Sequence, residues 1–230
     1  QAVLFGKMAA HFITLVVLSA FVLPLVIILM DAPLVLNACF VGTLFLGLWG
    51  MAAADTLLAR EGVQEGRPFV AFAVGANWPN KRWPVEHFAA LADRLYHAHY
   101  VPVLVGGGRL DATLAEDILR ASEIPPVNLV GRTNLKQLAH VFTRAALVLG
   151  GDTGPVHLAA GLRVPTVMLM GPTDANRNGP YGQLQNAIEV DRPCRGCWKR
   201  ACPKGLDCLA AIPVDAVAAK IGAVLRSVRR

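Results

Sequence analysis

Hydrophobic and polar positions divide the 230-residue chain into two parts with different patterns. From residue 67 onward, short apolar runs alternate with segments in which apolar residues recur every three or four positions. The first kind is typical of buried strands and the second of amphipathic helices. The predicted strands are 69–75, 101–108, 127–131, 146–151 and 165–171, and the predicted helices are 84–98, 111–121, 134–145, 152–162 and 213–228. This alternation predicts an α/β fold, a Rossmann-like parallel sheet covered by helices on both faces.

Residues 1–66 follow another pattern, because no charged residue occurs from 8 to 30 or from 32 to 54. Each stretch exceeds the ~20 apolar residues that a membrane-spanning helix needs. Asp31 and Pro33 supply a polar turn between them. We therefore predict an apolar, transmembrane helical hairpin over 1–66, followed by the Rossmann-like domain over 67–230. Two alternatives remain open: a signal peptide, which explains only the first stretch, and a buried helical pair of a soluble protein.

Charge is distributed as unevenly as hydrophobicity. The second part carries 20 basic and 12 acidic residues, hence +8, against +6 for the whole chain. A basic domain beside a membrane suits anionic head groups or a phosphorylated ligand. The basic residues are scattered and not interleaved with aromatic ones, which argues against nucleic acid as a partner. Basic residues at both ends of the predicted hairpin favour the cytoplasmic side for both ends.

The segment "GGDTGPVH" (150–157) leaves a predicted strand and opens a helix, at the edge of the sheet where ligands bind in such folds. Its glycines would let backbone approach a ligand, and Asp152 or Thr153 can cap the helix. Free backbone amides at the helix start favour an anion. His157 follows Thr153 by four residues and lies on the same helix face. The alternative is an ordinary capped helix after a tight turn.

Two further strand exits carry candidate ligand-binding groups. "GANWPNKRWP" (75–84) holds Lys81, a natural partner for a phosphate, although a solvated loop charge is the alternative. "GGGRLD" (106–111) places Asp111 at a helix start. Its carboxylate could accept hydrogen bonds from ribose hydroxyls or could simply cap the helix.

Four cysteines gather near the C-terminus, at Cys194, Cys197, Cys202 and Cys208. A C-x2-C pair followed by two more cysteines can hold a structural zinc ion tetrahedrally. Two disulfides are disfavoured in the cytoplasm. Packed or free thiols without metal are an equally open alternative.

Taken in order, "GANWPNKRWPVEHFAALADRL", "LVGGGRLD", "LVLGGDTGPVHLAAGLRVPTVMLMGPTDANRNGPYG" and the four-cysteine segment resemble the C-terminal half of glycosyltransferase family 9. This family comprises the heptosyltransferases of lipopolysaccharide core assembly. The resemblance implies the nucleotide-sugar domain of a GT-B glycosyltransferase. It also implies metal-independent, inverting transfer of a heptose-like sugar from a nucleotide-diphosphate sugar such as ADP-heptose. The acceptor would be lipopolysaccharide or a lipid-linked saccharide, at the cytoplasmic face of the inner membrane.

The same resemblance assigns roles to individual residues. Lys81 would contact the donor phosphates and Asp111 the ribose, and Asn77 would lie near the donor. Asp152, Thr153, Gly154 and His157 match the family's D-T-G-x-x-H donor motif. Within that motif, Asp152 and His157 are the predicted catalytic residues, with His157 steadying charge as the nucleoside diphosphate leaves.

The chain departs from the family pattern at its N-terminal side. Family members carry there an acceptor domain that provides the general base for the acceptor hydroxyl. Residues 1–66 are predicted as a hairpin instead, so the acceptor half is expected to be missing from this chain. Two other hypotheses follow: a non-catalytic module that binds a nucleotide sugar, and a nucleotide-sugar epimerase of related fold.

Overall fold

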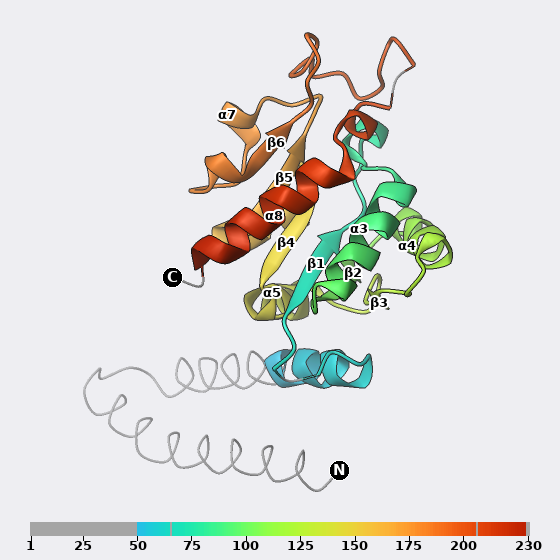
Figure 1. Cartoon of the computed structure of the whole chain (residues 1–230), viewed down its shortest axis with the longest axis vertical. Helices are drawn as coiled ribbons and strands as arrows, with labels where there is room; N and C mark the ends of the chain where they lie inside the picture. The colour runs from blue at the N-terminus through green and yellow to red at the C-terminus, as the bar shows by residue number, and fades with distance from the viewer. Residues whose placement is uncertain (1–49, 65, 206, 229–230) are drawn as a thin grey trace, which may run out of the picture. The chain divides into compact units, whose positions relative to one another are not determined.

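The computed structural model describes residues 50–64, 66–205 and 207–228 (Figure 1). Those from Met51 onward belong to one compact unit. The predicted hairpin falls mainly on residues 1–49 and so lies outside the described residues. Within the described part, none of the helices has the length and apolar character needed to cross a bilayer.

Six parallel strands form the sheet, which confirms the predicted α/β class. Their spatial order is β3-β2-β1-β4-β5-β6. This is the order of Rossmann folds, in which the chain first builds outward from β1 and then returns to build outward from β4. The strands are β1 (Phe69–Ala73), β2 (Val101–Val105), β3 (Val127–Asn128), β4 (Leu147–Gly151), β5 (Thr166–Met170) and β6 (Ala187–Glu189). The short β6 was not predicted, because its three residues give no clear apolar run.

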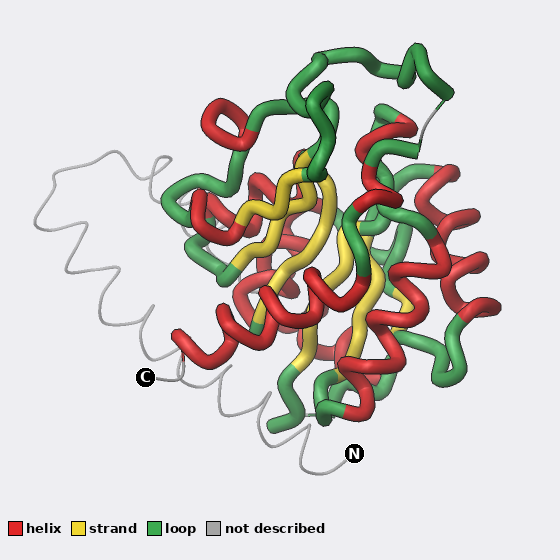
Figure 2. Tube along the Cα trace, turned by 45° about the horizontal axis from the view of Figure 1, so that its top comes forward, coloured by secondary structure: helices red, strands yellow, loops and turns green. Residues whose placement is uncertain are grey.

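Helices cover both faces of the sheet, as Figure 2 shows with helices in red and strands in yellow. One face is covered by α3 (Val85–His97), α4 (Arg109–Ala121) and α8 (Val214–Val228). The other is covered by α5 (Leu135–Arg144), α6 (Gly154–Gly161) and a helix over 50–60. The short α7 (Ala175–Asn178) and the 3-10 turns η1 (Pro79–Lys81), η2 (Leu184–Asn186) and η3 (Leu209–Ala211) lie in connections.

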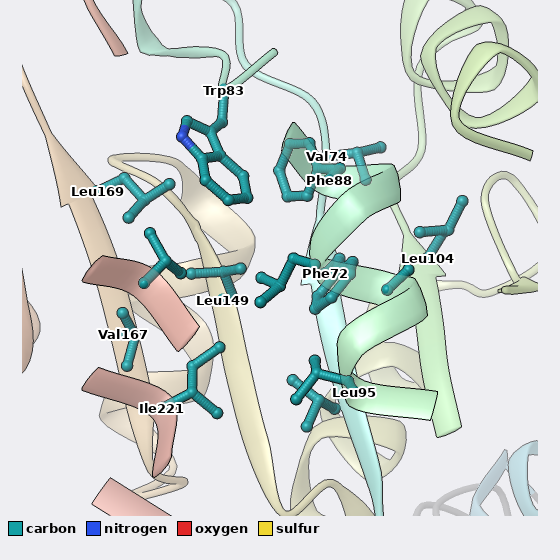
Figure 3. Close-up of a cluster of buried hydrophobic side chains, with 14 of the residues drawn as sticks. Phe72, Val74, Trp83, Phe88, Leu95, Leu104, Leu149, Val167, Leu169 and Ile221 are labelled. Carbon is teal, nitrogen blue, oxygen red and sulfur yellow. The ribbon is translucent and has the colours of Figure 1, made fainter. Parts of the chain in front are cut away.

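Alternation along the strands produces two separate hydrophobic cores. In β1, Val70 and Phe72 belong to the core under α3 and α8, whereas Ala71 and Ala73 belong to the opposite core. Phe72 packs against Phe88 of α3 with ring centroids 5.6 Å apart (Figure 3). Full burial of such a side chain contributes about 1.5–3 kcal/mol, so these contacts hold the helices to the sheet.

The helix over 50–60 packs on the sheet domain. Ala54, Leu58 and Val63 are buried in the core on the α5 and α6 side. The compact unit therefore takes in residues 51–66, which the sequence pattern assigns to the hairpin. Their apolar side chains explain this packing, since they cover the sheet face that α5 and α6 leave open.

Candidate functional site

A cavity of about 420 Å³ opens at the carboxyl ends of β1 and β4, where the strand order reverses. Ligands bind at this switch point in open parallel sheets, because loops diverge there on either side. The cavity is lined from three loops by Gly75, Ala76, Asn77, Trp78, Lys81, Asp111, Asp152, Thr153, Gly154 and Pro155. The structure thus brings together six of the predicted donor-site residues. The seventh, His157, contacts Asp152 from α6.

Asp152 is the centre of the polar network beneath this cavity. Its side chain is buried and accepts hydrogen bonds through both oxygens. Oδ2 accepts from Lys81 Nζ at 2.6 Å, from Thr173 Oγ1 at 2.7 Å and from Asn178 Nδ2 at 3.2 Å. Oδ1 lies 2.7 Å from His157 Nε2. Residues from three segments of the chain therefore converge on one carboxylate.

These contacts fix the ionisation of Asp152. Burial alone would raise its pKa, but hydrogen bonds from His157, Lys81 and Thr173, with the charge of Lys81, outweigh burial and hold the pKa well below the ordinary value. An ionised carboxylate can only accept hydrogen bonds. Nε2 of His157 therefore carries a hydrogen and donates a hydrogen bond to Oδ1 of Asp152. Asp152 is consequently a weak base, and its hydrogen bonds hold Lys81 and His157 in place. The catalytic roles of Asp152 and His157 stay predictions.

Lys81 is presented to the cavity by the turn η1. Its ammonium lies 4.3 Å from the ring centroid of Trp78, a cation–π contact, while it bonds to Asp152 on the other side. The Lys81 carbonyl at the end of this turn packs directly on Gly151, where any side chain would collide with it. Trp83, at the end of the same loop, donates from Nε1 to the carbonyl of Ile212 at 3.0 Å. The second half of the loop is therefore fixed in place.

The glycines of "GGDTGPVH" serve different purposes from the predicted one. A side chain at Gly150 would lie 2.8 Å from the Ala73 carbonyl oxygen, and one at Gly151 would meet the Lys81 loop. These two glycines accommodate neighbouring backbone, so the prediction that they admit a ligand was wrong. Gly154 has open space around it and lines the cavity, so it is the glycine that a ligand can approach.

Among the first four residues of α6, one amide is a candidate anion donor. Pro155 has no N–H, and the amides of Val156 and His157 both donate to the Thr153 carbonyl at 3.1 Å. This leaves the Gly154 amide. Thr153 makes no side-chain cap, contrary to one of the two predicted caps, and within the described residues its buried Oγ1 has no hydrogen-bond partner. A buried hydroxyl at the cavity wall without a partner is a further group that a ligand could satisfy.

Asp111 caps its helix and also lines the cavity. Oδ2 accepts from the amides of Gly107 at 3.0 Å and Gly108 at 3.2 Å, at the start of α4. The carboxylate packs against the Cα of Gly75, where a side chain could not fit. The structure confirms the helix cap, and the contact of Asp111 with a ribose stays a prediction.

Sequence reasoning missed three residues of this site. Thr173 and Asn178 bond to Asp152, and Trp78 stacks against Lys81. Thr173 and Asn178 stand in "MGPTDANRN", just after a predicted strand, so the strand-exit rule could have singled them out.

The cysteine-bearing segment lies beside the site. The amides of Gly196 and Trp198 donate to the carbonyls of Gly171 at 2.8 Å and Pro172 at 2.7 Å, beyond the end of β5. Cys208 packs on Gly171, and burial raises the pKa of its thiol. Among the described residues, no three His, Cys, Asp or Glu side chains come together as a metal site requires. Zinc binding by Cys194, Cys197, Cys202 and Cys208 stays a prediction.

A Rossmann-like sheet with a cavity at its switch point is typical of nucleotide-binding domains. The sequence profile of glycosyltransferase family 9 (heptosyltransferase) matches residues 49–206. The chain belongs to this family, as the resemblance of its motifs predicted.

Individual relatives agree with this assignment. Lipopolysaccharide heptosyltransferase 1 of Pseudomonas aeruginosa is 33% identical over 141 residues, which cover 60% of this chain and 38% of that protein. Lipooligosaccharide heptosyltransferase 2 of Haemophilus influenzae is 35% identical over 129 residues, covering 54% of this chain and 37% of that protein. The matched part of this chain thus spans well under half of these relatives.

Solved structures confirm the fold. The glycosyltransferase family 9 protein of Veillonella parvula superposes with a TM-score of 0.69 at 27% identity, covering 77% of this chain and 52% of that one. The E. coli ADP-heptose lipopolysaccharide heptosyltransferase II superposes with a TM-score of 0.65 at 26% identity, with the same coverages. These likenesses confirm the predicted fold, the nucleotide-sugar half of a GT-B glycosyltransferase.

Proposed function

We propose that this chain is a glycosyltransferase of the heptosyltransferase type. It transfers a heptose-like sugar from a nucleotide-diphosphate sugar, with ADP-heptose as the first candidate, to lipopolysaccharide or a lipid-linked saccharide. Family membership supports the reaction class. The name of the E. coli structural neighbour, an ADP-heptose lipopolysaccharide heptosyltransferase, supports the choice of donor and acceptor.

One observation carries the proposal: Lys81 and the Gly154 amide line a cavity whose floor is the ionised Asp152. Lys81 and His157 are oriented by Asp152 before any ligand arrives. Groups that are already positioned stabilise charge developing on a leaving diphosphate without reorganising during the reaction. The arrangement therefore suits a step in which a nucleoside diphosphate departs.

The reaction is a single displacement. The acceptor hydroxyl oxygen attacks the anomeric carbon while the bond from that carbon to the diphosphate oxygen breaks, and the electron pair leaves with the diphosphate. One displacement inverts the configuration at the anomeric carbon. The hydroxyl proton must pass to a base, and Asp152 is unsuited to this role because its pKa is lowered. By resemblance to the family, the base belongs to the acceptor half.

The proposed place of the reaction is the cytoplasmic face of the inner membrane. The charge-free stretches within 1–54 support a location at a membrane. Residues 67–230 carry 20 basic and 12 acidic groups, and this +8 charge supports attraction to an anionic lipid surface.

Turnover and binding must be tested separately. The full chain is incubated with ADP-heptose and a heptose-deficient lipopolysaccharide, and mass spectrometry follows free ADP and the extended saccharide. Release of ADP that depends on the acceptor supports the transferase. Donor binding by calorimetry without turnover supports a binding module instead. Absence of binding to ADP-, UDP- and GDP-sugars alike refutes both.

A further inference from the structure

A strongly basic loop, residues 191–204, borders the cavity and has no role in the proposed mechanism so far. It carries one acidic residue against five basic ones, hence +4: Arg192, Arg195, Lys199, Arg200 and Lys204. The loop rises beyond the ends of β5 and β6 in Figure 1, where it is drawn in orange to red. A concentration of positive charge near a cavity raises the local concentration of anionic ligands there.

The loop is tied to the walls of the cavity. Asn80, a buried residue of η1, donates from Nδ2 to the Lys199 carbonyl at 2.6 Å. Backbone bonds from Gly196 to Gly171 and from Trp198 to Pro172 fix the loop to the segment that carries Thr173. The basic loop is thereby held against two of the three segments that supply partners of Asp152.

These anchors place one loop residue next to the phosphate-binding lysine. The guanidinium carbon of Arg200 lies 5.7 Å from the ring centroid of Trp78, and Lys81 Nζ lies 4.3 Å from the same centroid, so the two cations are no more than 10.0 Å apart. Trp78 and Lys81 line the cavity, and Arg200, 119 residues after Lys81 in the chain, contacts the ring of this same tryptophan.

The charges of these cations are balanced differently. The Lys81 charge is paired with Asp152, so together they contribute little net attraction for an anion. Arg200 is exposed, and among the described residues no carboxylate forms an ion pair with it. A diphosphate carries negative charge on both phosphates and needs more than one neutralised lysine and one amide. A guanidinium offers a planar fork of donors that matches phosphate oxygens.

We infer that Arg200 is a second cation of the donor site and binds the diphosphate of the nucleotide sugar together with Lys81 and the Gly154 amide. This inference rests on the proposed function. It gives the basic loop a definite role, because its bonds to Asn80, Gly171 and Pro172 position Arg200 over Trp78.

Calorimetric titration of the full chain with ADP and with AMP tests the inference. Arg200→Gln is expected to weaken ADP binding about 10-fold or more and AMP binding less than about 3-fold, because a charge-assisted bond to the second phosphate is lost. Arg200→Lys keeps the charge without the fork and should fall between wild type and Arg200→Gln. Lys204→Gln removes one charge from the same loop but not one of the two cations that lie over Trp78, and should weaken either affinity by less than about 2-fold.

The outcomes distinguish this inference from the proposed function. If wild type binds ADP and Arg200→Gln binds it equally well, Arg200 has no part in the site, and the proposed function stands. An equal loss in Arg200→Gln and Lys204→Gln also overturns the inference, since it shows only a general effect of loop charge. A wild-type chain that binds none of ADP, UDP and GDP overturns both. Unchanged thermal unfolding of Arg200→Gln verifies that the variant is folded.

Discussion

Replacing Asp152 by asparagine tests the network most sharply, because the side chain keeps its shape and loses its charge. Three donors face Oδ2: Lys81 Nζ, Thr173 Oγ1 and Asn178 Nδ2. The amide oxygen must therefore take this position, since an NH2 group there would face three donors. The amide nitrogen then faces His157, whose Nε2 must switch from donor to acceptor. The variant thus keeps the hydrogen-bonding geometry but loses the ion pair and changes the tautomer of the histidine.

The expected loss of stability follows from the burial of the pair. Removing one partner of a fully buried ion pair destabilises a protein by about 3–5 kcal/mol. The Lys81 side chain keeps 12% of its surface exposed against 4% for Asp152, and Lys81 also retains its contact with Trp78. We therefore expect a smaller loss for Asp152→Asn, about 2–3 kcal/mol in the free energy of unfolding. The half-exposed pair of Asp117 with Arg120 gives a matched control, and Asp117→Asn should change stability by less than about 0.5 kcal/mol.

Urea unfolding of both variants at several pH values provides the assay. The pKa of Asp152 is lower in the folded chain than the ordinary value of about 3.9, so its contribution is fully present above that pH and is lost as the pH falls below it. The difference between wild type and Asp152→Asn should therefore be largest near neutral pH and should shrink below about pH 4. A loss no larger than that of Asp117→Asn, or a difference independent of pH, would refute the network.

Three other predictions concern glycines and cysteines. Gly151→Ala should destabilise the chain by about 1–3 kcal/mol in urea unfolding and weaken ADP binding, because its methyl group collides with the loop after β1. The control is Gly161→Ala, which places a methyl group in open space within α6 and should stabilise the chain by up to about 1 kcal/mol. Equal changes in stability for the two variants would contradict the steric argument. Iodoacetamide should modify exposed Cys197 before Cys208, whose thiol has a raised pKa; peptide mass spectrometry showing equal rates would contradict this. If the cysteines bind zinc, metal analysis should find less zinc in Cys194→Ser than in the parent chain.

Much of the fold could be predicted because periodicity reports burial directly. The strand over 69–75 and the helix over 84–98 were found as β1 and α3 within two residues at each end, since their apolar spacing is unambiguous. β6 was missed because only three residues pair with β5. The helix over 50–60 was assigned to a hairpin because an apolar helix that covers a sheet and one that enters a membrane share the same composition.

Several of the residues that line the cavity could be predicted from sequence, but the hydrogen bonds among them could not. Strand exits pointed to Lys81, Asp111 and Asp152, because parallel strands end at one edge of the sheet. The carboxylate of Asp152 accepts hydrogen bonds from Lys81, Thr173 and Asn178. These contacts depend on distances across three loops, and no local sequence pattern encodes such distances. For the same reason, the role of Gly151 was misjudged: its neighbour is a carbonyl 70 positions earlier in the chain.

The most direct measurement is calorimetric titration of the full chain and of Lys81→Gln with ADP, with adenosine as the reference ligand. If the cavity at the ends of β1 and β4 holds a diphosphate, wild type binds ADP far more tightly than adenosine, and Lys81→Gln loses most of this advantage. Equal affinities for ADP and adenosine in wild type, or an ADP affinity that Lys81→Gln leaves unchanged, would contradict the assignment of this cavity to a nucleoside diphosphate.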